Sequence, residues 1–167
     1  MSVRRIRRPA IVAGLAVAVT AGLFGAAGRV TGEPRPRPVA ASVFSGPVEK
    51  IRDGDTIELE GVAVRLQGVA APELGEPLGR ESRDALVRLV SGRSVACAPD
   101  GTRTRGRIVA VCTVDGRDLG AALVAAGLAR DCPRFSGGRY ADLERSAAAR
   151  GAPIGRLYPL PSYCLAP

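Results

Sequence analysis

Histidine and tryptophan are absent from this 167-residue sequence, and Lys50 is its only lysine. Without histidine, any general base must be a carboxylate, a tyrosine or a metal-bound water. The other 23 of the 24 basic residues are arginines, and with 16 acidic residues the net charge is +8. Guanidinium groups bind phosphates through paired hydrogen bonds, whereas lysine acts as a point charge. This composition suits an anionic partner, although biased codon usage also produces arginine-rich chains.

Cysteine is limited to four residues, and none of them forms the C-x-x-C pair that is typical of zinc sites. In an oxidising compartment, four cysteines predict two disulfides, for which three pairings are possible. We predict Cys97–Cys112, because these residues lie symmetrically about a turn near Thr104, as facing residues of a hairpin would. The second disulfide would then be Cys132–Cys164, which would attach the C-terminal tail to the body of the protein.

The first 28 residues are expected to direct export rather than to form part of the fold. A basic start, MSVRRIRRP, precedes an uncharged run rich in alanine and glycine, with small residues suited to cleavage near Ala27 or Gly28. An uncleaved membrane anchor is the alternative, because the run is long enough to span a bilayer. Residues 29–42 then read as a flexible, proline-rich linker and residues 43–167 as the domain. We expect a secreted or envelope protein, with membrane contact only if the segment is retained.

The rest of the chain carries the pattern of a small barrel with helices. Aromatic residues make up only 4 %, but the hydrophobic share of 46 % is enough for the core of one domain. Alternating apolar residues predict five short strands, and apolar residues at helical spacing predict about three helices. The helices are expected near residues 82–90, 118–126 and 140–150. One helix between the third and fourth strands is the order of an oligonucleotide-binding (OB) barrel, so we predict an α+β fold of this type.

Four segments resemble the staphylococcal nuclease-like, or thermonuclease, family. They occur in the family's order and with its spacing: DGDT at 53–56, VRLQGVAAPE at 64–73, RGRIVA at 105–110 and DLGAALVAAGLA at 118–129. The likeness extends over about residues 48–150 and supports the OB-fold prediction. It implies calcium-dependent cleavage of DNA, RNA or both with little sequence preference, and it does not imply a protein partner.

The resemblance also implies roles for individual residues. Cleavage of a phosphodiester needs cations to neutralise the phosphoryl oxygens and a water aligned with the leaving oxygen. Asp55 and the backbone carbonyl of Ala71 correspond to calcium ligands, and Glu73 to the group that orients or deprotonates the water. Arg65 and Arg107 correspond to the two arginines that hold the phosphate and stabilise its transition state.

Position 70 departs from the family pattern, because Ala70 stands where members usually have an aspartate that is a second calcium ligand. One carboxylate fewer should lower calcium affinity. Asp53 and Thr56 are expected beside the ligands, and Asp53 or Glu76 could compensate for the missing acid. If the site lacks a ligand, Ala70→Asp should raise activity at low calcium.

Two further readings of the sequence stay open beside a nuclease. One is a module on the same barrel that binds nucleic acid or a partner without cleaving, and the other is an envelope-anchored interaction domain. Outside the motifs, Phe135 and Tyr140 are read as core residues, with base stacking as the alternative. Arg103 and Arg105 are read as solvated charge on a hairpin tip, with contact to nucleic acid as the alternative.

Overall fold

The structure, a computed structural model, describes residues 42–165. The expected signal or anchor segment, and all but the last residue of the expected linker, lie outside this range. Within the described range, no helix combines the length and the apolar character needed to cross a bilayer.

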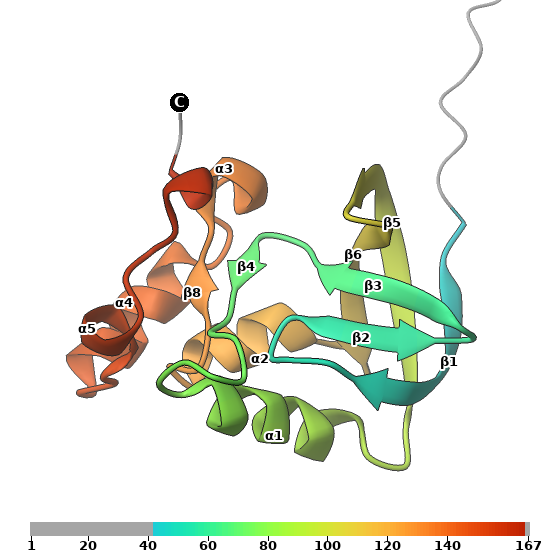
Figure 1. The fold of residues 1–167 in the computed structure, drawn as a ribbon, viewed down its shortest axis with the longest axis horizontal. Coiled ribbons are helices and arrows are strands. Elements are labelled where there is room, and N and C mark those ends of the chain that lie inside the picture. The colour runs from blue at the N-terminus through green and yellow to red at the C-terminus, as the bar shows by residue number, and fades with distance from the viewer. Residues whose placement is uncertain (1–41, 166–167) are drawn as a thin grey trace, which may run out of the picture. The chain divides into compact units, whose positions relative to one another are not determined.

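Five strands form the barrel that the alternation of apolar residues predicts. They are β1 (Phe44–Ile51), β2 (Thr56–Leu59), β3 (Val62–Leu66), β5 (Ser94–Thr104) and β6 (Arg107–Val114). Neighbouring strands pair in the order β3-β2-β1-β5-β6, and a parallel pairing of β3 with β6 closes the barrel (Figure 1). The closure brings the segments that follow β3 and begin β6 to the same region of the molecule.

Three two-residue strands add to the predicted set. β7 (Arg117–Asp118) extends the main sheet, while β4 (Val69–Ala70) and β8 (Arg130–Asp131) pair with each other in antiparallel register. Such short strands carry no periodic signal, so the sequence did not predict them. The β4–β8 pair holds the segment after β3 against the segment that leads to the C-terminal helices (Figure 1).

The three predicted helices are present as α1 (Gly79–Val90), α2 (Leu119–Ala125) and α4 (Ala141–Ala149). Helix α1 buries Leu86 against the barrel. The Asp118 carboxylate caps α2 by accepting a hydrogen bond from the backbone N–H of Ala121 at 3.0 Å.

Three one-turn elements were not predicted, because they are too short for a helical period. They are α3 (Pro133–Ser136), α5 (Ile154–Leu157) and the 3-10 turn η1 (Ser162–Cys164). Together with α4 they form a helical layer beside β4 and β8 (Figure 1).

Buried apolar side chains form two clusters. The larger cluster fills the barrel and the space beneath α1 and α2, and it includes Tyr140, whose hydroxyl donates to Asp118 at 2.9 Å. Tyr140 is therefore a core residue, as predicted. Phe135 is half exposed, so the core reading is wrong for this residue. The smaller cluster lies between β4 and the C-terminal segment and consists of Ala70, Cys132, Ile154, Tyr158 and Cys164.

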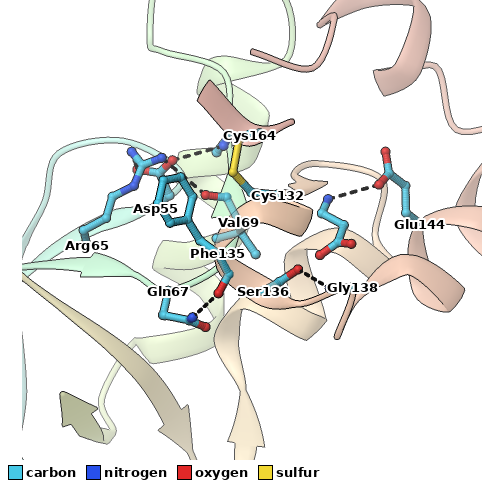
Figure 2. The surroundings of a disulfide bond; sticks show 12 residues. Asp55, Arg65, Gln67, Val69, Cys132, Phe135, Ser136, Gly138, Glu144 and Cys164 are labelled. Atoms are coloured by element: carbon cyan, nitrogen blue, oxygen red, sulfur yellow. Dashed lines mark hydrogen bonds and ion pairs between the residues drawn. A yellow bond between two sulfur atoms is a disulfide. The ribbon is translucent and has the colours of Figure 1, made fainter. Parts of the chain in front are cut away.

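The structure contains the two disulfides that the sequence predicts. Cys97 and Cys112 face each other across β5 and β6, with an S–S distance of 2.04 Å. Cys132, at the start of α3, is bonded to Cys164 in η1 (Figure 2). The loops that they close span 15 and 32 residues. By chain entropy these closures stabilise the fold by about 3 and 4 kcal/mol.

Candidate active site

A tight turn places Asp55 immediately before β2. The Asp53 carboxylate accepts a hydrogen bond from the Asp55 N–H at 2.9 Å, which closes the turn on itself. Only glycine fits between them, because a Cβ on Gly54 would lie 1.9 Å from the Ser82 hydroxyl oxygen on α1. The turn therefore packs directly onto α1, and Asp55 is only 2 % exposed.

Both carboxylate oxygens of Asp55 accept hydrogen bonds. Oδ1 accepts from Arg65 Nη1 at 2.5 Å and from the Thr56 hydroxyl at 3.1 Å. Oδ2 accepts from the backbone N–H of Ala71 at 3.1 Å. Burial raises the pKa of Asp55 to about 7, although the Arg65 guanidinium opposes the rise and Asp53 adds to it. The site thus holds a buried aspartate, Asp55, that is hydrogen-bonded to one arginine, Arg65.

Arg107 joins this group through Thr56. Its Nη1 donates to the Thr56 hydroxyl at 3.0 Å, while its Nε donates to the Thr104 carbonyl at 3.4 Å. No acidic side chain forms an ion pair with Arg107 in the described part of the chain. Its remaining N–H groups are free to bind an anion.

The pairing of β3 with β6 explains why the two arginines lie on the same face of the sheet. Arg65 is in register with Val109, and the two-residue period of a strand places Arg107 on the same face as Val109. Arg65 also donates to the Val69 carbonyl at 3.3 Å, which fixes its orientation (Figure 2). Of the residues that the resemblance selects, the structure thus brings Asp55, Thr56, Arg65 and Arg107 into one connected network.

Glu73 lies outside this network. It is exposed in the loop between β4 and α1, and its carboxylate forms no hydrogen bond with Asp55, Arg65 or Arg107. The loop itself is compact. The Glu73 N–H donates to the Glu76 carboxylate at 2.8 Å, and its carbonyl accepts from the Glu76 N–H at 2.9 Å. Glu73 would have to reach a water near the arginines from the rim of the site.

Ala70 is fully buried, and its side chain belongs to the apolar cluster beneath the C-terminal segment. The segment packs on β4 through Ile154 and Tyr158 and is attached by the Cys132–Cys164 disulfide. The sequence gives no signal for this contact apart from the predicted disulfide. Tyr158 is therefore a residue near the site that sequence reasoning missed.

The donor set fits a calcium ion only in part. Carboxylate and carbonyl oxygens are the ligands that calcium prefers, and Asp53, Asp55 and the Ala71 carbonyl could supply them. However, no group of three or more His, Cys, Asp or Glu side chains able to hold a metal occurs within residues 42–165. Both Asp55 oxygens also accept hydrogen bonds already. The residues present would form a weak site rather than a complete one.

Comparison with known proteins assigns the fold to a family. The sequence model of the family described as staphylococcal nuclease homologue matches residues 63–152, more than half of the chain. The chain belongs to this family. The matched region contains Arg65, Glu73 and Arg107, whereas Asp55 precedes it and the disulfide-bound tail follows it.

Curated relatives are similar over part of their length. The succinoglycan biosynthesis protein ExoI of Rhizobium meliloti (strain 1021) is 35 % identical over 119 residues, covering 64 % of this chain and 62 % of its own. An uncharacterized endonuclease of Escherichia coli is 35 % identical over 97 residues, covering 55 % and 63 %. A probable staphylococcal-like nuclease, CAN3, of Oryza sativa subsp. japonica is 59 % identical over 32 residues, covering 19 % and 8 %. The chain spans about three fifths of the length of the first two relatives.

Proposed function

We propose that the protein is a nuclease that hydrolyses phosphodiester bonds of DNA, RNA or both with little sequence specificity. The network of Asp55, Thr56, Arg65 and Arg107 carries this proposal, because it presents two guanidinium groups at one end of the barrel. Contacts to phosphate oxygens carry no sequence information, so a site of this kind acts on many sequences. Family membership and the relatives named as nucleases support the same reading.

The chemistry follows from the position of each side chain. Arg107 has unused donors and would bind a non-bridging phosphate oxygen, where its charge stabilises the more negative transition state. Arg65 is held by Asp55 and by the Val69 carbonyl, so it is oriented before substrate arrives. Glu73, in a protein without histidine, would orient or deprotonate the attacking water from the rim.

Calcium is the cofactor that this proposal includes. Asp55 and the Ala71 carbonyl would be its ligands, with Asp53 and Thr56 beside them. When bound, the ion would supply positive charge that neutralises the phosphoryl oxygens. We also propose a secreted or envelope location, which the two disulfides support because such bonds persist in oxidising compartments.

Cleavage assays test the proposal directly. The purified protein is expected to degrade both single-stranded DNA and RNA at millimolar calcium and to lose most of this activity in excess chelator. The variant Glu73→Gln, which keeps the size of the side chain, should be slower by about 10²-fold or more if Glu73 activates the water. No cleavage of either substrate at millimolar calcium would refute the nuclease proposal.

A second candidate is a module that binds nucleic acid without cleaving it. The buried Ala70 and the occupied oxygens of Asp55 favour this candidate, because both weaken a metal site. It would show binding that weakens steeply with salt, and no turnover at any calcium concentration.

The variant Ala70→Asp tests the account of the missing acid. The new carboxylate would enter a buried apolar cluster, so without calcium we expect a loss of about 3–5 kcal/mol in the free energy of unfolding. Calcium should restore part of this stability. The calcium concentration that gives half-maximal activity should be lower for the variant than for the wild type.

Thermal unfolding and activity, each measured over a calcium titration, check this expectation. Ala70→Asn is the matched control, because it adds a polar group of similar size without the charge. Equal calcium responses in the Asp and Asn variants would contradict the account.

A further inference from the structure

A groove between α1 and α2 contains none of the residues of the candidate active site. The two helices are in contact with each other beside the barrel (Figure 1), and the groove between them has a volume of about 260 Å³. Three of the residues that line it are the arginines Arg88, Arg93 and Arg117. The others are alanines and leucines, so the lining contains no acidic side chain. This α1–α2 groove therefore combines positive charge with apolar walls.

Most of the positive charge of the groove is not compensated by acids of the chain. Arg88 and Arg117 are exposed and form no ion pair within residues 42–165. The acid one turn before Arg88, Asp84, is instead paired with the preceding residue at 3.2 Å. Arg93 contacts Asp115 at 3.6 Å, but these side chains are 49 % and 74 % exposed, and such pairs contribute little. Two guanidinium groups are therefore available to an anion from outside the chain.

The three arginines come from separate elements whose backbones are fixed. Arg88 is near the C-terminal end of α1. Arg93 follows this helix in a turn, where its N–H donates to the Val90 carbonyl at 3.0 Å. Arg117 is on β7 and pairs in register with Val114 of β6. Because hydrogen bonds hold the backbone at each position, the three side chains surround the groove without any rearrangement of the fold.

The lining of the groove indicates phosphate as the chemistry of its ligand. Guanidinium groups bind phosphate oxygens through paired hydrogen bonds, and arginines from three elements present several such groups to one polyanion. A membrane surface suits the groove less well, because Leu123 is buried and Leu89 is only partly exposed. Neither leucine can enter lipid as the apolar residues of an interfacial helix do. A strand of nucleic acid meets both conditions, since it carries regularly spaced phosphates and needs no protruding apolar group.

Helix α1 connects the groove to the candidate active site. Near the N-terminal end of α1, Ser82 packs against Gly54, in the turn that precedes Asp55. Arg88 follows Ser82 by six residues, which corresponds to about 9 Å along the helix axis. The groove is thus near enough to the site for a strand of several nucleotides to occupy both.

We propose that the α1–α2 groove is a second phosphate-binding site, which holds the substrate strand beyond the nucleotide that is cleaved. The inference rests on the proposed function, because it gives the nuclease a preference for long strands over short ones. Arg88 and Arg117 bind the phosphates, and neither residue takes part in the cleavage step. The groove therefore acts on substrate affinity and leaves kcat unchanged.

The double variant Arg88→Gln, Arg117→Gln removes two charges and keeps the length of most of each side chain. The Kd of a fluorescent single-stranded oligodeoxynucleotide of about 20 residues is measured by anisotropy in chelator, over a series of salt concentrations. The slope of log Kd against log salt should fall by about 1.4, since each phosphate contact to a single strand contributes about 0.7. At low salt Kd should rise by about 10-fold, with Tm unchanged because both side chains are exposed. Each single variant should lower the slope by about half as much.

The matched control is Arg145→Gln, Arg156→Gln, which removes the same charge from exposed positions on α4 and α5. It should keep the wild-type slope. Kinetics with two substrates give a second readout, because the groove variant should raise KM for the long strand by about 10-fold and leave KM for a dinucleotide unchanged. A dinucleotide KM that rises by the same factor would overturn the proposal, since the arginines would then act at the cleavage site.

The two proposals fail in different ways. If the wild type cleaves and the groove variant keeps the wild-type Kd and slope, the inference fails while the nuclease proposal stands. If the wild type binds the oligonucleotide without cleaving it, the nuclease proposal fails, and the salt slope still decides the role of the groove. Equal losses in the groove and control variants would overturn the inference, as would a wild type that does not bind the oligonucleotide. An unchanged Kd combined with weaker binding to phosphatidylglycerol vesicles would also overturn it and would assign the groove to a membrane surface.

Discussion

Replacement of Arg107 by lysine is expected to lower kcat/KM for DNA or RNA cleavage by about 10²–10³-fold, the usual effect of removing one transition-state donor. Lysine keeps the positive charge but loses the planar pair of N–H groups that binds two oxygens at once. Within the described residues the Arg107 side chain forms no ion pair, and it donates hydrogen bonds only to the Thr56 hydroxyl and the Thr104 carbonyl. The change should therefore leave the Tm nearly unchanged.

The control for this experiment is Arg103→Lys, the same chemical change on the exposed tip of the β5–β6 hairpin. It should alter kcat/KM by less than about threefold, because contacts with exposed charges are weak and screened by salt. If both variants lose activity equally, the arginines act as a general basic surface. That result would contradict the assignment of Arg107 to the active site.

The free energy of unfolding is expected to fall by about 4 kcal/mol as pH rises from 4 to 7, and Asp55→Asn should abolish this fall. Burial raises the pKa of Asp55 from 3.8 to about 7 in the folded protein. Between these two values the folded state holds a proton that the unfolded state has released, so stability decreases as pH increases. Each unit of the shift corresponds to about 1.4 kcal/mol. Above pH 7 both states are ionised, and the dependence on Asp55 ends.

Denaturant unfolding at a series of pH values measures this effect. Asp84→Asn is a suitable control, because the Asp84 side chain is 54 % exposed and its loss should not alter the pH dependence. A wild-type profile that is flat, or that rises, between pH 4 and 7 would show that the Arg65 ion pair outweighs the burial of Asp55. The same titration predicts a fall in activity below pH 7, since Asp55 then no longer carries the charge that orients Arg65.

Much of the barrel follows from local pattern. The alternation of Ile57 and Leu59, and of Val64 and Leu66, matches the buried positions of β2 and β3. The helical spacing of apolar residues located α1, α2 and α4 because each of these helices is long enough to repeat its period. The one-turn helices and two-residue strands are too short to repeat, so only long-range pairing reveals them.

The contacts of the candidate site likewise divide into local contacts, which follow from the sequence, and long-range contacts, which depend on the fold. The turn at Asp53 and Asp55 is local, since its hydrogen bond joins residues two apart and its glycine is required by packing on α1. The contact between Asp55 and Arg65 spans ten residues and follows from the hairpin. Arg107 reaches Thr56 across 51 residues, which sequence reasoning could place only through the family resemblance.

By itself, the sequence determined the five barrel strands, the main helices, the two disulfides and the residue types available for chemistry, because these follow from local periodicity, cysteine number and spacing, and composition. Only the tertiary structure decided that Ala70 is covered by the C-terminal segment, that Glu73 is exposed and outside the hydrogen-bonded network, and that Phe135 is exposed. It also decided that Tyr158 packs in the same apolar cluster as Ala70. These features arise from contacts between segments far apart in the chain, where burial and charge depend on what the fold brings together.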